Sequence, residues 1–98
     1  MDIKKIKNEN ELTLRVEGRL ETTTAPVLEI IIKSELDGIT SLIFDFSELD
    51  YISSAGLRVL LTAQKIMNNQ GIMKVTGVND MVCEIFEVTG FSDILTIV

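Results

Sequence analysis

Two adjacent serines, Ser53 and Ser54, are the residues whose type and position most suggest chemistry. The apolar run Ser41–Phe46 before them predicts a buried strand, and the stretch Leu57–Met67 after them predicts a helix. The serines would then lie on a strand-to-helix turn, where free backbone N–H groups and the positive end of the helix dipole favour an anion. A phosphate attached to one of these serines would be held by that end of the helix.

The same serines have a structural alternative, which is helix capping. Serine is a common N-cap, because its hydroxyl accepts a bond from an unpaired N–H of the first turn. Two details favour a further function. One serine suffices as a cap, and Gly56 in the first turn weakens a helix by about 1 kcal/mol relative to alanine. A glycine at that position suggests that another group approaches the backbone closely.

Chemistry that needs other residue types is missing from the sequence. The chain has no His and one Cys, so it has no Ser-His-Asp triad and an improbable zinc site. Ser54 lacks the glycine two residues earlier that a nucleophile elbow requires, and no Gly-rich phosphate loop is present. Asp45, Glu48 and Asp50 are typical of a turn and of solvated strand ends, with Mg²⁺ binding as the weaker alternative. We therefore expect no catalytic residue, no cofactor and no metal.

Composition indicates one globular domain and argues against two classes of partner. The 98 residues are 46% apolar and 24% charged, with a net charge of −6. This acidity argues against nucleic acid and against an anionic membrane, and it suits a basic protein partner or simple solubility. The lone Cys83 predicts a buried, inert thiol in a reducing cytoplasm, and no apolar leader follows the N-terminus.

Hydrophobic periodicity predicts alternating strands and helices. The expected strands are Asp2–Lys7, Leu12–Leu20, Leu42–Phe46, Ile72–Thr76 and Ile94–Val98. The first two should be antiparallel because a short turn joins them, and the others should be parallel because helices separate them. The fold class is therefore α/β, with a mixed, mostly parallel sheet of four or five strands and helices packed against it.

The expected helices have recognisable ends. One of Thr22–Thr24 caps the first helix, Pro26 lies in its first turn and Asp37-Gly38 ends it. Asn79 or Asp80 caps the third helix, and Gly90 ends it. We expect these inward-facing residues in the two helices: Val27, Leu28, Ile31, Ile32 and Leu36, then Met81, Val82, Ile85 and Phe86. Ile30 should be exposed.

Three segments carry a family resemblance. The stretch Asp50–Leu57 (DYISSAGL) resembles the signature of STAS domains, specifically that of bacterial anti-sigma-factor antagonists. Gly18–Ala25 (GRLETTTA) resembles the stretch before the first helix of this family, and Phe86–Phe91 (FEVTGF) resembles the stretch that ends its last helix. The resemblance runs in order over nearly the whole chain, so we expect a single STAS domain over residues 1–98.

The resemblance implies a partner-switching role in the cytoplasm. The unphosphorylated protein binds an anti-sigma factor that is also a serine kinase with a histidine-kinase-like ATP-binding fold, and binding frees a sigma factor. Phosphorylation releases the complex, and a PP2C-type phosphatase restores the hydroxyl. The family's acceptor position matches Ser54. The residue before it is often Asp in the family and is Ser53 here, which leaves Ser53 as an alternative acceptor, whereas Ala55 removes a competing hydroxyl.

The resemblance also supplies candidate partner contacts and rival functions. The candidate contacts are Glu21, Thr22, Ser53, Gly56, Leu57 and Arg58. Core packing is an equal alternative for Leu57, and a solvated helix face is the alternative for Arg58. STAS domains also serve as structural subunits of lipid-transport or stress-sensing complexes, where Ser54 would be only a cap. A third alternative is a STAS domain that binds a small ligand, although no dedicated pocket residues stand out.

Overall fold

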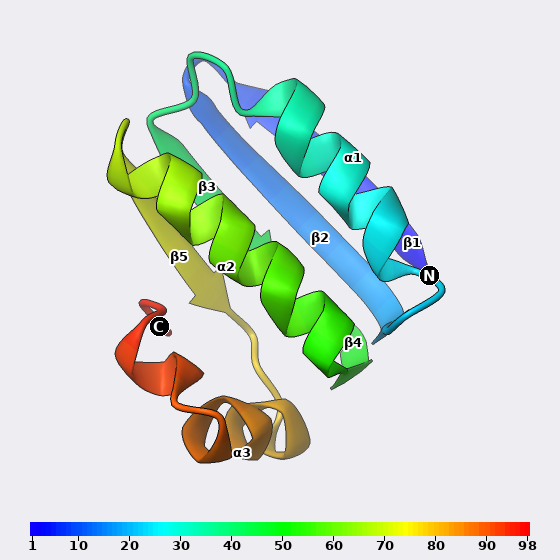
Figure 1. Cartoon of the computed structure of the whole chain (residues 1–98). Helices are drawn as coiled ribbons and strands as arrows, with labels where there is room; N and C mark the ends of the chain where they lie inside the picture. The colour runs from blue at the N-terminus through cyan, green and yellow to red at the C-terminus, as the bar shows by residue number, and fades with distance from the viewer.

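The chain folds as a five-stranded mixed sheet, with two helices lying side by side across one of its faces (Figure 1). The computed structural model describes all 98 residues. The elements in chain order are β1 (Asp2–Asn8), β2 (Glu11–Leu20), α1 (Ala25–Glu35), β3 (Ser41–Asp45), β4 (Leu49–Ile52), α2 (Ser54–Asn68), β5 (Ile72–Thr76), α3 (Asp80–Val88) and the short 3₁₀ helix η1 (Phe91–Asp93). Helices α1 and α2 cover the sheet, and α3 packs at its end beside β4.

The strand order is β1-β2-β3-β5, with β4 paired to β2 outside this path. Strands β1 and β2 are antiparallel around a two-residue turn, in which Glu9 has φ of 56°. Strands β2, β3 and β5 are parallel. These directions confirm the prediction, because a short turn reverses the chain whereas a helical crossover returns it to the same end of the sheet.

The core lies between the sheet and the helices. In β2, alternate residues Leu12, Leu14 and Val16 point toward the helices and are buried, while Thr13 and Arg15 point to the other face. The core cluster holds 24 apolar residues, and no polar or charged residue is buried as a whole. No helix has both the length and the apolar character that crossing a membrane requires.

Strand β4 was not predicted, because the sequence indicated only a turn between Phe46 and the serines. Three of its four residues pair in parallel with the far end of β2, from Gly18 to Leu20, and the register shifts between Gly18 and Arg19 because Asp50 has no partner. Acidic residues are rare in strands, so Asp50 weakened the sequence signal. The strand that directly precedes α2 is thus β4, and β3 ends one turn earlier.

Two expected inward residues face solvent instead. Val27 is 52% exposed and Met81 is 57% exposed. Each residue immediately precedes a buried one, Leu28 or Val82, and successive helical residues point about 100° apart. Ile30 is exposed as predicted, at 68%.

The C-terminal segment is not a strand. After η1 the chain forms a single parallel bridge between Ile97 and Val75 of β5. Gly90 has φ of 82°, which turns the chain sharply between α3 and η1. Its role as the glycine that ends α3 is therefore confirmed. Cys83 is half-buried rather than buried, with its Sγ 3.9 Å from Glu87 Oε1.

Candidate functional site

The two serines at the start of α2 differ in exposure. Ser54 is the first residue of the helix and is exposed. Ser53 is the N-cap residue, and its hydroxyl oxygen is buried without a hydrogen-bond partner. Only the Ser54 side chain is therefore open to another protein in this structure.

Neither serine side chain caps α2, although Ser53 occupies the N-cap position. The helix has no side-chain bond to its first-turn N–H groups and no acidic residue in that turn. Helix α3 provides the contrast, because Asn79 Oδ1 accepts a bond of 2.8 Å from the backbone N–H of Val82. The capping alternative is therefore not realised at Ser53 or Ser54, and the amino end of α2 keeps donors that favour an anion.

The start of α2 is fixed by backbone bonds to β2. Strand β4 ends at Ile52, and the N–H of Ser53 donates to the Leu20 carbonyl at 2.9 Å. The N–H of Leu57 then donates to the Ser53 carbonyl at 2.9 Å, which closes the first helical bond. These bonds set where Ser54 lies relative to the end of β2.

Gly56 serves packing inside the domain. A Cβ atom at this residue would lie 2.8 Å from Ile52 Cγ1, 2.8 Å from Leu20 Cγ and 3.1 Å from Leu20 Cδ2. Both neighbouring side chains are buried core residues. The expectation of a close approach is correct, but the approaching groups belong to this chain and lie beneath the helix.

The loop before α1 is held by its own side chains. Thr24 Oγ1 accepts a bond of 2.8 Å from the Glu21 N–H and donates one of 2.8 Å to the Arg19 carbonyl. Arg19 Nε lies 3.1 Å from Glu21 Oε2, and its guanidinium stacks 4.5 Å above the Tyr51 ring. Glu21 therefore has a partner within the chain, whereas Thr22 is exposed at the tip of the loop.

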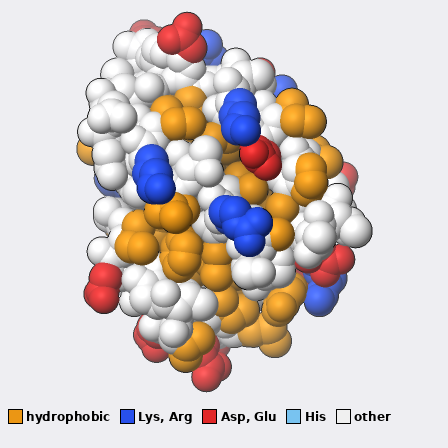
Figure 2. Space-filling view, viewed as in Figure 1, with side chains coloured by type: hydrophobic (Ala, Val, Ile, Leu, Met, Phe, Trp, Pro, Cys, Tyr) orange, Lys and Arg blue, Asp and Glu red, His pale blue; other side chains and the backbone are white.

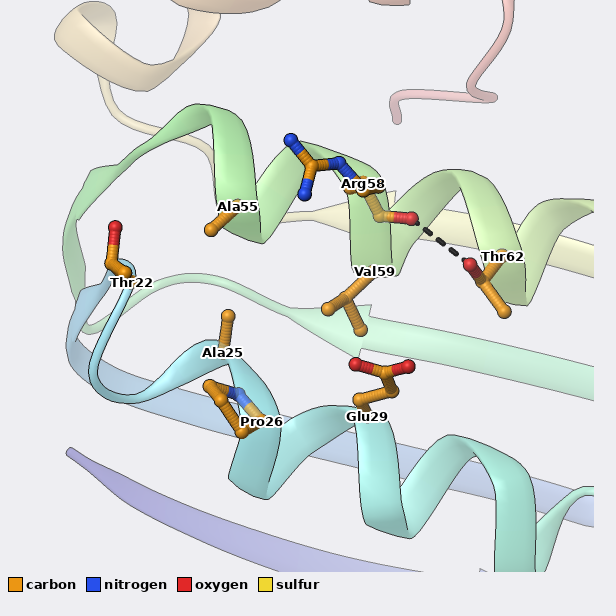
Figure 3. Close-up of a pocket in the computed structure, with 8 residues that line it drawn as sticks. All are labelled: Thr22, Ala25, Pro26, Glu29, Ala55, Arg58, Val59 and Thr62. Atoms are coloured by element: carbon orange, nitrogen blue, oxygen red, sulfur yellow. Dashed lines mark hydrogen bonds between the residues drawn. The ribbon is translucent and has the colours of Figure 1, made fainter.

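A groove of about 260 Å³ runs between the amino ends of α1 and α2. Figure 3 shows Thr22 and Pro26 on one side and Ala55 and Arg58 on the other. The other lining residues are Ala25, Glu29, Val59 and Thr62. The sequence predicts Thr22 and Arg58 as contacts, and it does not reveal the other lining residues because the groove depends on how the two helices pack. The groove lies beside Ser54, because Ala55 is the next residue.

Two predicted contacts lie below the surface. Leu57 is 6% exposed and belongs to the core, as its alternative proposed, and Gly56 is buried against Leu20 and Ile52. Arg58 is exposed and makes no ion pair in this structure. The exposed residues of the predicted set are therefore Thr22, Ser54 and Arg58, and Glu21 is half-buried.

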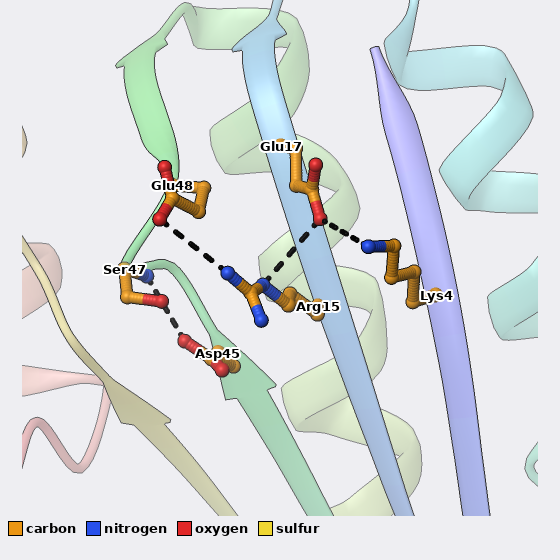
Figure 4. A network of polar contacts seen from close by, with 6 residues as sticks. All are labelled: Lys4, Arg15, Glu17, Asp45, Ser47 and Glu48. Carbon is orange, nitrogen blue, oxygen red and sulfur yellow. Dashed lines mark hydrogen bonds and ion pairs between the residues drawn. The ribbon is translucent and has the colours of Figure 1, made fainter.

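The carboxylates near β4 belong to a polar network on the sheet face away from α1 and α2 (Figure 4). Arg15 lies 3.4 Å from Glu17 and 3.4 Å from Glu48, and Lys4 pairs with Glu17 at 3.4 Å. Asp45 Oδ1 accepts a 3.0 Å bond from the backbone N–H of Ser47. Two carboxylates of the weaker magnesium alternative, Asp45 and Glu48, thus have separate partners, and no three His, Cys, Asp or Glu side chains cluster.

Hydrogen bonding shifts the ionisation of one member of this network. The bonds from the Ser47 backbone and side chain, followed by attraction to Arg15, hold the pKa of Asp45 below its ordinary value despite some burial. Asp45 therefore stays ionised in the folded chain and stabilises the turn between β3 and β4.

Comparisons with known proteins agree with this geometry. A family model described as STAS domain matches residues 2–98. The chain belongs to the STAS domain family. This STAS domain is 36% identical over 84 residues to BtrV of Bordetella bronchiseptica, covering 84% of this chain and 72% of that protein. It is 26% identical over 98 residues to the anti-sigma-B factor antagonist of Bacillus subtilis, covering 99% of this chain and 88% of that protein.

Solved structures place the STAS domain in the same fold. An anti-sigma factor antagonist from Mycobacterium paratuberculosis superposes with a TM-score of 0.88, at 20% identity over 98% of this chain and 83% of that one. The phosphorylated form of the Bacillus protein SpoIIAA superposes with a TM-score of 0.78, at 14% identity over 99% and 91%. The predicted fold class is therefore confirmed, and so is the family.

Proposed function

We propose that this chain is an anti-sigma factor antagonist that acts as a phosphorylatable protein-binding switch. The unphosphorylated form binds an anti-sigma factor that is also a serine kinase with a histidine-kinase-like ATP-binding fold, and this frees a sigma factor in the cytoplasm. Phosphorylation of Ser54 ends the complex, and a PP2C-type phosphatase reverses the modification. The named role of the Bacillus subtilis relative supports the general function.

The observation that carries the proposal is the position of Ser54. Its side chain is exposed at the first residue of a helix that lacks a side-chain cap, while the Ser53 hydroxyl is buried. A kinase active site needs an accessible hydroxyl, so Ser54 is favoured over Ser53 as the acceptor. The phosphorylated form of SpoIIAA is a fold neighbour, which supports a phosphorylated state within this fold.

The proposed modification is a transfer of the terminal phosphoryl group of ATP. Ser54 Oγ attacks the γ-phosphorus, the bond to the β-phosphate oxygen breaks, and ADP leaves. The hydroxyl proton passes to a base of the kinase. The phosphatase hydrolyses the ester with water and returns serine and inorganic phosphate.

The proposed release follows from charge and space at the contact surface. A phosphate adds a charge of about −1.5 to −2 and three acceptor oxygens where the partner meets a neutral hydroxyl. A loss of about 3 kcal/mol in binding already weakens a complex more than a hundredfold. The domain itself need not refold, because the amino end of α2 already favours an anion.

The proposed partner surface surrounds Ser54. Thr22 and Arg58 border the groove between α1 and α2, and Glu21 lies in the loop before α1. Ser53, Gly56 and Leu57 act from below by fixing the position of the first turn of α2. The chain's net charge of −6 suits a basic partner surface.

The test is phosphotransfer measured by mass. The chain is incubated with ATP and the serine kinase encoded near it in the genome, and intact mass is followed by tandem mass spectrometry. We expect one added phosphoryl group on Ser54, retained in Ser53→Ala and lost in Ser54→Ala. Phosphate found mainly on Ser53 or on a threonine would move the acceptor. No phosphorylation, together with a neighbouring transporter ATPase and permease, would favour the structural-subunit alternative.

A further inference from the structure

Helix α2 carries positive charge in a chain that is acidic as a whole. It contains Arg58 and Lys65 and no Asp or Glu, whereas the net charge of the chain is −6. Figure 2 shows Lys and Arg side chains standing on the face that bears α1 and α2, with most acidic side chains near its edge. An anion on this helix therefore meets no carboxylate from the helix itself.

Arg58 is the arginine without a partner. The sequence has three arginines, and the structure pairs Arg15 with Glu17 and Glu48, and Arg19 with Glu21. Arg58 is exposed and forms no ion pair. The N–H donors of its guanidinium group are therefore all free to bind an added acceptor group.

The spacing of Arg58 places it one turn after Ser54. Helical residues four apart lie on the same face with their Cβ atoms about 5–6 Å apart. Helical side chains also lean toward the amino end of the helix, so a long side chain covers the turn before its own Cα. Figure 3 shows the Arg58 guanidinium lying back along α2 in the direction of Ala55, the neighbour of Ser54.

We propose that Arg58 binds the phosphate of phosphorylated Ser54 within the same chain. This inference rests on the proposed phosphorylation and adds an internal receptor for the group. Arg58 and the open N–H groups at the start of α2 hold the phosphate from two sides. Phosphorylation then adds an anion at Ser54 and at the same time pairs the Arg58 cation, which was free at the rim of the groove. A partner that contacts this rim would thus lose the free guanidinium group and meet a bulky, strongly hydrated phosphate in place of a hydroxyl.

The experiment uses the whole 98-residue chain with phosphoserine incorporated at position 54 by genetic code expansion, so that no kinase is needed. The pH titration of the phosphate is followed by phosphorus NMR. Pairing with a guanidinium favours the doubly charged phosphate, so the pKa of the phosphate should be lower with Arg58 present. We expect Arg58→Gln to raise the titration midpoint by about half a pH unit, the size supported by an exposed charge-assisted pair one turn apart.

Two further variants separate direct pairing from general charge. Lys65→Gln removes the same charge from the same helix about 16 Å from position 54, since each residue rises 1.5 Å, and it should leave the midpoint unchanged. Arg58→Lys keeps the charge without the planar fork and should give a midpoint between those of wild type and Arg58→Gln. Circular dichroism confirms that each variant is folded.

Two outcomes would overturn this inference. They are equal midpoints in wild type and Arg58→Gln, or an equal rise in Lys65→Gln and Arg58→Gln. Either result would leave the proposed phosphorylation untouched, because the phosphate is incorporated during synthesis. A kinase that fails to modify Ser54 would instead contradict the proposed function, whatever the phosphate titration shows.

Discussion

Replacing Gly56 by alanine tests whether packing beneath α2 sets the position of Ser54. Two effects of the change oppose each other. Alanine stabilises a helix by about 1 kcal/mol relative to glycine. The new Cβ would lie 2.8 Å from atoms of both Leu20 and Ile52, which are 0% and 1% exposed. These side chains cannot swing into solvent, so the overlap must be relieved by moving α2 or repacking the core.

The steric cost of the new Cβ atom should exceed the gain in helix propensity. Overpacking a filled core costs about 1–3 kcal/mol. We therefore expect Gly56→Ala to lower the free energy of unfolding by about 1 kcal/mol, which is the middle of that range less the helix-propensity gain. For a domain of this size each kcal/mol lowers the melting temperature by roughly 4–8 °C. The displaced first turn should also slow phosphorylation of Ser54 by its kinase.

Urea unfolding and thermal melts followed by circular dichroism give the stability of Gly56→Ala. Ala55→Gly is the matched control, because it makes the reverse exchange at the adjoining, half-buried residue without adding an atom. The control should lose stability only by the propensity difference, at most about 1 kcal/mol. A Gly56→Ala protein as stable as wild type, or more stable, would refute the packing argument.

Four further outcomes are expected. Ser54→Ala should stay within about 0.5 kcal/mol of wild-type stability in urea unfolding, because its exposed side chain caps nothing, and in pull-down it should bind the kinase and resist release by ATP. Ser54→Asp should be as stable or up to about 1 kcal/mol more stable, because its charge suits the helix end, and calorimetry should show weaker kinase binding. Asn79→Ala should cost about 1–2 kcal/mol in a melt, since it removes the α3 cap and a bond to the Leu49 carbonyl at 2.9 Å. Asp45→Asn should reduce the loss of stability that the protein shows as the pH falls into the acid range. The pKa of Asp45 is lowered in the folded chain, so its stabilisation is full above the ordinary aspartate range and is lost as pH falls through the folded pKa. An unchanged dependence of stability on acid pH would count against the role of Ser47.

Most of the sheet could be predicted from the sequence because the alternation of apolar and polar residues is strong. Alternation from Leu12 to Leu20 and the helical crossovers specified strand directions without tertiary information. Strand β4 was missed because it is four residues long, contains Asp50 and pairs with β2 through an irregular register. Short strands of this kind are stabilised by their neighbours more than by their own residues.

The site was predicted in part. The family resemblance pointed to Ser54 and Arg58, and both residues are exposed on α2. The sequence could not separate Ser53 from Ser54, because the direction of a hydroxyl depends on how β4 enters the helix. It also could not reveal the groove beside Pro26, since that space exists only when α1 and α2 pack together. Contacts between distant segments of the chain are what local periodicity leaves unspecified.

The most direct test of the proposed switch compares the affinity of two forms of the chain for one partner. Isothermal titration calorimetry would measure binding of unmodified and Ser54-phosphorylated protein to the anti-sigma factor kinase encoded in the same genome, with ADP present. We predict tight binding of the unmodified form and an affinity at least about a hundredfold lower for the phosphorylated form, a difference of roughly 3 kcal/mol. Equal affinities for two forms that circular dichroism shows to be folded would contradict the switch.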